Sequence, residues 1–456
     1  MSYQQKFKSL GIEIPSILLP KSSPEFNMEK WPVIACDQFT QDRGFWRKVK
    51  DIVCASPSTF NMIFPEIFLA DDDAAGRITD IHSNMKRYLK DGIFSPLGHG
   101  FIYLERDTPY QKKRRGLIAA IDLEHYDWHP DARPLIRSTE GTVRERLPAR
   151  CSIRRGAPLE LPHILLLIDD DKDILLPALG EMAKRNTPVY NTPLMMDCGN
   201  VSGWFLDTEN DFSFIADKLD ELCRRSSERY EGQPFLFAAG DGNHSLAAAK
   251  EIWNEIKEGI GDQVTEITHP CRYALVEIEN IYDRAIQFEP IHRLVFDIGY
   301  EGIVSLLSKL PGFSLRNVNS EQELSASVSS GLLRDKPPES AVQYGNRFGV
   351  ISEGRYALIE TSASGIATAC LQPLLDEYAK DNPQLIDYIH DEKELFRLSA
   401  GKEHTANLKV SGILLPPVQK SGLFETVARL GPLPRKSFSM GHSCEKRFYL
   451  ECRSLI

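Results

Sequence analysis

The sequence predicts a mixed α/β protein, and three observations support this class. Short apolar runs alternate with longer segments in which apolar residues recur at helical spacing. Neither an internal repeat nor a long low-complexity tract interrupts this alternation. One run, residues 234–250, contains a buried strand, a polar turn and a helix start in direct succession.

The elements follow from apolar runs bounded by turn residues and from helical periodicity with start and stop signals. The strand candidates are 101–105, 116–123, 163–168, 235–239, 273–278, 357–360 and 412–415. The helix candidates are 72–90, 209–225, 243–259, 301–310, 371–379 and 423–430.

The length of 456 residues suits two or three domains. The segment 320–340 holds few bulky apolar residues after a short helical stretch, so a subdomain junction is expected near it. We expect a ligand-binding core over residues 1–295 and a C-terminal α/β domain over 296–456.

Composition excludes several classes of protein. The 42% hydrophobic and 26% charged residues are those of an ordinary globular chain, and the net charge of −10 argues against general nucleic-acid binding. The nine cysteines form no Cys-x-x-Cys pair and are expected to be reduced. The apolar run near the N-terminus is too short for a signal peptide and is interrupted by prolines. No apolar run in the sequence reaches the length of a membrane span. We therefore expect a cytoplasmic protein that does not bind membranes, of undetermined oligomeric state.

The polar turn within residues 234–250 is the main candidate site. A helix beginning near Asn243 leaves backbone N–H groups unpaired and places partial positive charge at its start, which suits phosphate or carboxylate. Gly240 and Gly242 allow close backbone approach, Asp241 can face a divalent cation, and His244 can move a proton.

A structural interpretation of the same turn is about equally consistent with its spacing. Aspartate and asparagine are common helix N-caps, and glycine is a common turn residue. The position favours function, because a turn from the carboxyl end of a buried strand into a helix is where open α/β sheets bind ligands.

The turn also carries a resemblance to a known family. The chain resembles a large bacterial and archaeal family of unknown function (domain of unknown function 1015, sometimes labelled ParB-like), whose signature is Asp-Gly-His-His-Arg. This chain has Asp241-Gly242-Asn243-His244-Ser245, so the family arginine is replaced by serine. The other blocks that resemble the family are 31–38, 115–118, 136–142, 159–163, 290–294 and 433–437.

A looser resemblance links the turn to the ParB and sulfiredoxin fold, which free-serine kinases share. In that fold a Gly-x-His-Arg turn at a helix N-terminus holds nucleotide phosphates. The resemblance implies a ParB/sulfiredoxin-like core and phosphorylation of a small molecule, with free L-serine as acceptor. Ser245 has no guanidinium that could bind phosphate through two charged hydrogen bonds. Another cation must therefore take this role, or the phosphate donor must differ from that of the kinases.

A second group of polar residues could complete the site. Arg137 can neutralise a transferring phosphate, Thr139 can donate a hydroxyl, and Glu140 can take the proton of an acceptor hydroxyl. The alternative is that this segment caps a helix. Arg293 and Lys436 are further candidate cations for the phosphates, with an interdomain salt bridge and plain surface as their alternatives. His163 at a strand start and the acidic residues 169–171 are assigned structural roles.

Several enzyme classes lack their motifs in this chain. There is no Walker loop, no Gly-x-Ser-x-Gly, no His-Glu-x-x-His, no dinucleotide-binding glycine fingerprint and no protein-kinase signature set. The expected function is a small-molecule kinase that uses ATP, ADP or pyrophosphate, with Mg²⁺ bound at Asp241. The alternatives are a non-catalytic nucleotide-binding regulator of ParB-like type and a metal-dependent phosphate-ester hydrolase.

Overall fold

The computed structural model describes residues 1–22, 26–111, 113–261, 269–329, 346–363, 365–400 and 409–456. The chain divides into two compact units, one of Met1–Ile286 with Gly441–Ile456 and one of Gln287–Met440. The division expected from the sequence assigns Gly441–Ile456 to the second domain, whereas this segment belongs to the first unit. Of the weakly patterned segment 320–340, residues 330–340 lie outside the described residues.

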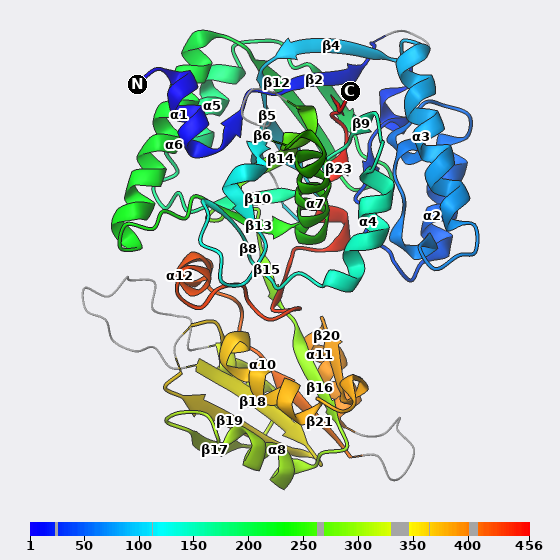
Figure 1. The fold of residues 1–456 in the computed structure, drawn as a ribbon. Coiled ribbons are helices and arrows are strands. Elements are labelled where there is room, and N and C mark those ends of the chain that lie inside the picture. Colours follow the sequence, from blue (N-terminus) through cyan, green and yellow to red (C-terminus); the bar gives the residue numbers. More distant parts are fainter. Residues whose placement is uncertain (23–25, 112, 262–268, 330–345, 364, 401–408) are drawn as a thin grey trace. The chain divides into compact units, whose positions relative to one another are not determined.

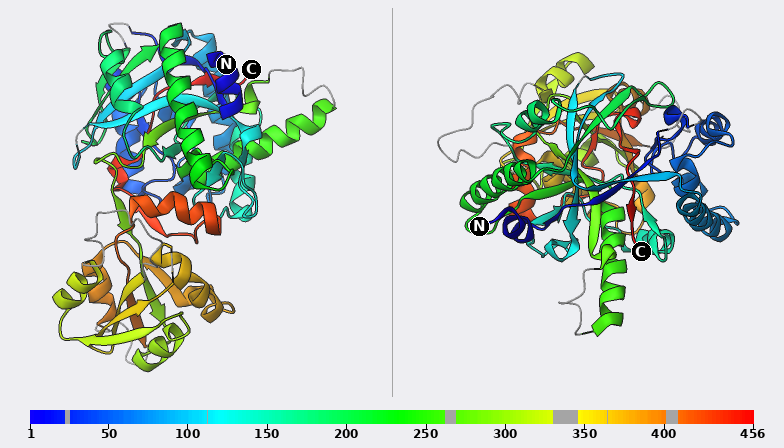
Figure 2. Two further views of the ribbon diagram at one scale, coloured as in Figure 1. Left: turned by 90° about the vertical axis from the view of Figure 1, so that its left-hand side faces the viewer. Right: turned by 90° about the horizontal axis from the view of Figure 1, so that it is seen from above.

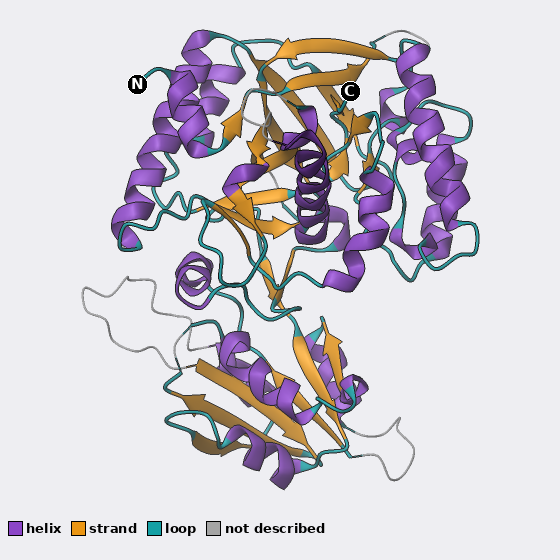
Figure 3. Cartoon of the chain, in the orientation of Figure 1, coloured by secondary structure: helices purple, strands orange, loops and turns teal. Residues whose placement is uncertain are grey.

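The first unit is built on a mixed ten-stranded sheet, which confirms the predicted α/β class (Figure 3). Its strands include parallel and antiparallel neighbours, with β13 parallel to β8 but antiparallel to β10. The strand order is β11 (Tyr190–Pro193), β12 (Asn200–Leu206), β5 (Phe101–Asp107), β6 (Arg114–Asp122), β14 (Tyr273–Asn280), β10 (Leu165–Ile168), β13 (Phe237–Asp241), β8 (Ile136–Ser138) and β7 (Tyr126–Asp127), with β1 (Ile12–Glu13) paired to β6.

Alternate residues of the central strands point to opposite faces, and both faces are covered. On β5, Phe101 and Tyr103 contribute to one apolar cluster while Ile102 and Leu104 contribute to the other. Both faces of this sheet are therefore buried, which explains its nearly continuous apolar strands. The first cluster includes residues of α1 (Tyr3–Leu10), α4 (Leu147–Arg154), α5 (Leu176–Ala183), α6 (Glu209–Arg229) and α7 (Asn243–Ile260); the second includes α2 (Arg43–Val53), α3 (Ala74–Lys90) and the end of the chain.

Helices α1 and α6 lie side by side (Figures 1 and 2). Tyr3 and Phe212 pack with ring centroids 5.6 Å apart, and Phe7 packs on Phe101 of β5 at 5.5 Å. Both helices begin with a capping box, at Ser2 and Thr208, in which side chain and backbone satisfy each other's hydrogen bonds.

The second unit is a six-stranded antiparallel sheet between two layers of helices. Its order is β17 (Ser314–Val318), β19 (Arg355–Thr361), β18 (Asn346–Ser352), β21 (Val410–Leu414), β16 (His292–Phe296) and β20 (Ile386–Ile389). One face packs against α8 (Tyr300–Leu307) and α10 (Ala367–Tyr378), the other against α9 (Glu321–Ser329) and α11 (Glu392–Ser399). The unit also contains β15 (Phe288–Pro290), α12 (Lys420–Leu430) and β22 (Phe438–Met440), with β15 paired to β22.

The C-terminal segment, Gly441–Ile456, is threaded through the first unit (red in Figure 1). Its strand β23 (Phe448–Tyr449) pairs with β3 (Val33–Ile34), and β24 (Arg453–Ser454) pairs with β9 (Leu159–Glu160). Between them, Cys452 exchanges two backbone hydrogen bonds with Leu18 of β2 (Ser16–Pro20), at 2.8 and 3.0 Å. The end of the chain therefore joins strands from three distant parts of the sequence.

Buried ion pairs anchor this segment to the central sheet. The Arg447 guanidinium contacts Glu277 of β14 at 2.6 Å and also pairs with Glu451. Burial would raise the pKa of Glu277, but the charges of Arg447 and Arg114 outweigh it and lower that pKa. Burial and the neighbouring Glu277 raise the pKa of Glu279 well above its usual value, although the Arg114 guanidinium lies 2.8 Å from this carboxyl and opposes the rise. Each of these two buried carboxyls therefore has an arginine partner, Arg447 for Glu277 and Arg114 for Glu279.

Strands β5 and β6 hold the backbone of the same segment. The Arg106 guanidinium donates to the Glu445 carbonyl at 3.2 Å and to that of Lys446 at 2.5 Å, and Arg114 donates to Glu445 at 2.6 Å. Arg106 and Arg114 are each 4% exposed, so water does not compete for these bonds. The sheet therefore dictates where residues 445–447 lie.

We predict that Arg447→Met destabilises the first unit by about 3–5 kcal/mol, because Glu277 and Glu451 would be left buried without their cation. Urea unfolding followed by tryptophan fluorescence isolates this unit, since all five tryptophans lie in it. The control is Arg155→Met, whose pair with Glu255 is about half exposed and should contribute less than about 1 kcal/mol. Equal effects of the two substitutions would contradict this account.

Candidate functional site

The candidate turn lies where β13 ends and α7 begins, as predicted from the sequence. The register between β10 and β13 shifts here, since Leu166 pairs with Ala239 and Leu165 with Asp241. Gly240 is the extra residue of this bulge. Bulges of this kind redirect the next side chain and are frequent beside functional sites.

Gly242 caps α7 with a left-handed backbone, at φ 76°, and no side chain caps this 18-residue helix. Its first intrahelical bond is donated by Leu246 to the Gly242 carbonyl at 3.0 Å. The N–H groups of residues 243–245 therefore have no carbonyl acceptor within the helix. They give the start of α7 a partial positive charge. Glycine is required at position 242 by both φ and space, because a Cβ would lie 3.0 Å from the Ile164 Cα.

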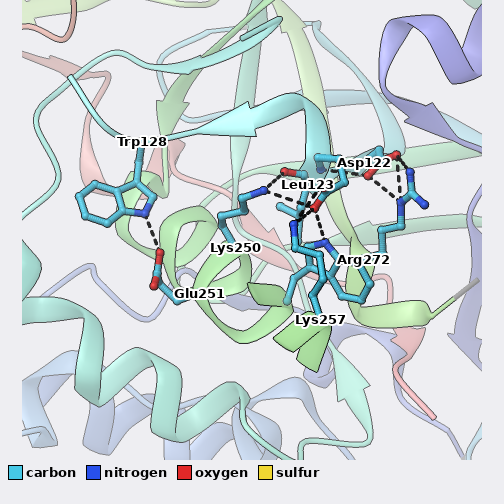
Figure 4. Close-up of polar contacts among 9 residues, drawn as sticks. Asp122, Leu123, Trp128, Lys250, Glu251, Lys257 and Arg272 are labelled. Atoms are coloured by element: carbon cyan, nitrogen blue, oxygen red, sulfur yellow. Dashed lines mark hydrogen bonds and ion pairs between the residues drawn. The ribbon is translucent and has the colours of Figure 1, made fainter. Parts of the chain in front are cut away.

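Polar contacts along α7 fix the direction of the helix against the segment that follows β6 (Figure 4). Long side chains from successive turns reach the same short segment, so the helix cannot rotate without breaking several contacts. These contacts are Lys250 with the Leu123 carbonyl at 2.8 Å, Trp253 with Glu124 at 2.6 Å, Lys257 with Glu124 at 2.9 Å and Trp128 with Glu251 at 3.0 Å.

Asp241 makes two contacts at the start of the helix. Its Oδ1 accepts the N–H of Gly242 at 2.9 Å, and its Oδ2 lies 3.3 Å from the Lys446 ammonium. The side chains of Asp241 and Lys446 are 17% and 10% exposed, so the pair is largely shielded from water. A cation from the C-terminal segment thus stands at the turn.

Asp37, which follows β3, completes the charged part of the site. Burial would raise the pKa of Asp37, but the charges of His163 and Lys446 and a hydrogen bond from Gln38 outweigh it and lower that pKa. The Asp37 carboxyl therefore stays ionised at neutral pH. Lys446 therefore pairs directly with Asp241 and also lowers the pKa of Asp37 through its charge.

Ser245, which replaces the family arginine, belongs to a hydrogen-bonded chain. Its Oγ lies 3.1 Å from His163 Nε2, and His163 Nδ1 lies 2.8 Å from the Tyr449 hydroxyl. Tyr449 in turn accepts the N–H of Cys36 at 3.4 Å. His163 lies beside Ser245 because β10 starts at the sheet edge where its antiparallel neighbour β13 ends. The Ser245 side chain is therefore tied to β3 and β23 through hydrogen bonds.

The segment 139–143 runs along the turn. Thr139 Oγ1 donates to the Ala239 carbonyl at 2.6 Å, and the Val143 N–H donates to His244 Nε2 at 3.1 Å. Glu140 lies between these two anchors and is half-buried. Because Nε2 of His244 accepts this bond, its proton resides on Nδ1 when the ring is neutral.

Two shielded polar atoms beside the turn have no hydrogen-bond partner within the described residues. They are Oδ1 of Asn243, the first residue of α7, and Oγ1 of Thr142. Buried polar atoms are nearly always satisfied, so such a pair marks a place where a polar ligand can complete the bonding.

The predicted cation Arg137 has its guanidinium at the other end of β13. Arg137 turns its guanidinium toward the start of β13, where it donates to the carbonyls of Pro134 and Pro234 and stacks over Phe235 at 4.7 Å. Arg293 and Lys436 belong to the second unit. Arg293 is fully buried there, bonded to Gln372 at 2.8 Å.

Sequence reasoning missed Asp37 and Lys446 and gave His163 only a structural role. Cys36-Asp37-Gln38 stands in a block that resembles the family, directly after a short apolar strand, and this signal could have indicated Asp37. Nothing near Lys446 in the sequence indicates its partner, because pairing with β3 and anchoring by Arg106 bring it to the turn.

In the described parts of the chain, no cluster of three or more histidine, cysteine, aspartate or glutamate side chains is arranged to hold a metal ion. Within the same residues, no helix combines the length and apolar character needed to cross a membrane.

A family model described as "Protein of unknown function (DUF1015)" matches residues 18–378. The chain belongs to this family. The match spans the turn, the block around Asp37 and His163, and it confirms the resemblance seen in the sequence. A search of curated proteins gave no match.

Three solved structures resemble this family member. A mutant of free serine kinase in complex with AMP is 10% identical and has a TM-score of 0.39, over 76% of this chain and 95% of that one. A conserved hypothetical protein from Pyrococcus furiosus is 11% identical with a TM-score of 0.35, over 74% and 94%. SbnI with a C-terminal truncation, from Staphylococcus aureus, is 8% identical with a TM-score of 0.31, over 73% and 85%.

We predict that Gly242→Val abolishes anion binding at the helix start, because valine disfavours positive φ and its side chain would press on Ile164. Titration calorimetry with pyrophosphate should show binding to the wild type and none to the variant. Gly259→Ala is the control, since a Cβ there meets nothing within 4 Å and the helix is the same. Equal affinity of all three proteins would place the anion elsewhere.

Proposed function

We propose that this protein is a small-molecule phosphotransferase that moves phosphate from a nucleotide or pyrophosphate to a hydroxyl acceptor. The observation that carries the proposal is the Lys446–Asp241 pair at the uncapped start of α7, with Asp37 within the electrostatic influence of Lys446. Transfer of phosphate requires positive groups to hold the donor and carboxylates to hold a divalent cation or an acceptor. Free L-serine is the first acceptor to test, because the looser resemblance of the turn implies it.

The donor phosphates would lie against the first turn of α7. Backbone N–H groups of residues 243–245 point out of the helix start, and Gly240 and Gly242 leave room for close approach. Lys446 supplies the cation that Ser245 does not, since its ammonium stands 3.3 Å from Asp241. This role was expected of Arg137 or Arg293, but the contacts of the turn favour Lys446.

Asp241 and Asp37 fit a magnesium ion. Mg²⁺ is commonly held by one or two carboxylates together with phosphate oxygens, so two carboxylates suffice when the donor is bound. When bound, the ion would neutralise charge on the transferring phosphate. Lys446 would leave Asp241 and pair with the donor phosphate instead.

Two carboxylates, Asp37 and Glu140, are candidates for the base that removes the proton of the acceptor hydroxyl. The lowered pKa of Asp37 makes it a weak base and suits it to a cation. Glu140, anchored beside the turn by Thr139 and Val143, is the proposed base for the acceptor hydroxyl. His244 lies at the same place, because its Nε2 accepts the Val143 N–H at 3.1 Å.

A nucleotide-binding regulator remains a second candidate, and one observation favours it. Ser245 is held by His163 and Tyr449 instead of presenting a charge to the donor, so the turn can bind phosphate without stabilising its transfer. Such a protein would bind nucleotide at the same turn and release it unchanged.

We expect phosphorus NMR of the full chain with Mg²⁺, an amino-acid mixture that includes L-serine, and ATP, ADP or pyrophosphate to show a new phosphomonoester signal. Lys446→Met should lower kcat/KM by about 10- to 100-fold, the scale of one charge-assisted contact. Lys257→Met, which removes a cation from the far end of the same helix, should have little effect. Donor binding without any product would favour the regulator, and absence of both would refute the proposal.

A second variant tests the magnesium role of Asp241. Asp241→Asn keeps the oxygen that accepts the Gly242 N–H and removes the charge, so the fold should persist while magnesium-dependent turnover falls by orders of magnitude. Initial rates over a magnesium series and a thermal melt of each protein separate the two effects. If the remaining activity only follows the folded fraction, Asp241 is a structural cap.

A further inference from the structure

Two cysteines far apart in the sequence meet in the first unit. The sulfur atoms of Cys198 and Cys444 are 2.6 Å apart, closer than two thiols normally approach, and no disulfide joins them. Cys444 stands in the C-terminal segment, two residues before Lys446, and Cys198 stands in the loop between β11 and β12.

Both sulfurs are held in place by their surroundings. In the loop that carries Cys198, Leu194 donates to the Gly199 carbonyl at 2.8 Å, and Met196 and Asp197 adopt positive φ of 61° and 57°. On the other side, the Cys444 carbonyl accepts a bond from Arg106, which also holds Lys446. The contact therefore comes from two anchored backbones and not from two mobile side chains.

We propose that Cys198 and Cys444 are a reversible disulfide site that fastens the C-terminal segment to the β11–β12 edge of the sheet. The co-reactant is a small disulfide of the glutathione class. This inference is independent of the proposed phosphotransfer, since it concerns residues outside the turn.

The two thiols are suited to different steps of the exchange. The hydrogen bond from Cys198 and the charge of Arg106 outweigh burial and lower the pKa of Cys444 to about 7. Cys444 is half-buried and Cys198 is fully buried, so a reagent from solution reaches Cys444 first. A thiolate that is accessible and has a lowered pKa is the attacking group in thiol–disulfide exchange.

The exchange balances in two steps. The Cys444 thiolate attacks one sulfur of the small disulfide, whose S–S bond breaks and releases one thiolate. The Cys198 thiol then attacks the Cys444 sulfur of the mixed disulfide, whose S–S bond breaks, and the Cys198 proton passes to the second small thiol as it leaves. Two protein thiols are oxidised by two electrons, and the small disulfide is reduced to two thiols.

The bond would restrain the part of the chain that carries Lys446. Cys198 and Cys444 are 246 positions apart, so a link between them closes a very long loop and restricts the unfolded chain. It would add a covalent tie to a segment that otherwise depends on buried ion pairs and short strands. The oxidised protein should therefore melt at a higher temperature than the reduced one.

The test is peptide mapping by mass spectrometry of the native full chain after oxidised glutathione or after a phosphine reductant. We expect a peptide linking Cys198 to Cys444 only in the oxidised sample, together with the rise in melting temperature. Cys198→Ser should stop at the first step and carry one glutathione on Cys444. Cys444→Ser should form no link and show no rise, while Cys223→Ser should behave as the wild type.

The inference is overturned if both thiols stay alkylatable under native conditions that attach glutathione to the exposed Cys54. It is equally overturned if the link appears only after the protein has been unfolded in urea, because the native contact would then play no part.

Discussion

Burial of the Arg447 guanidinium between Glu277 and Glu451 is the constraint on which the first unit depends. A charge this deep is tolerated only when opposite charges lie close to it, and both carboxylates do. The pair fastens the end of the chain to the middle of the central sheet. Arg106 and Arg114 complete the arrangement by binding the backbone of residues 444–446. The C-terminal segment is thus part of the core and not an appendage.

This arrangement links stability to the candidate site. Lys446 directly precedes Arg447, so the ion pairs that hold the segment also place the ammonium beside Asp241. The carbonyl of Arg447 accepts the N–H of Ala35 at 2.8 Å, which brings the loop with Asp37 to the same place. A rigid support that is buried away from solvent can hold charged groups near a ligand without loss of side-chain order.

The replacement of the family arginine by Ser245 changes the chemistry of the turn without loosening it. The Ser245–His163–Tyr449 chain of hydrogen bonds occupies that position. A helix start with its own partial positive charge still attracts an anion, and Lys446 adds a full charge from another part of the chain. The positive charge at this site therefore comes from the end of the sequence instead of from the turn.

The sequence by itself determined the mixed α/β class, most of the long helices, and the position of the turn between a buried strand and α7. These features depend on local periodicity and on turn residues such as Gly242, which neighbouring residues alone specify. The division at residue 296 rested on local composition, and local composition carries no information about the return of Gly441–Ile456 to the first unit.

Only the tertiary structure decided which charges stand at the turn. Arg137 appears next to Glu140 in the sequence, yet its guanidinium turns to the opposite end of β13, while Lys446 arrives from the end of the chain. Alternate residues of a strand face opposite sides of the sheet. The partner of a long side chain is therefore set by which other strands and loops lie on its side. Antiparallel pairing of β10 with β13 and of β23 with β3 sets those neighbours, and pairing between distant strands leaves no local signal in the sequence.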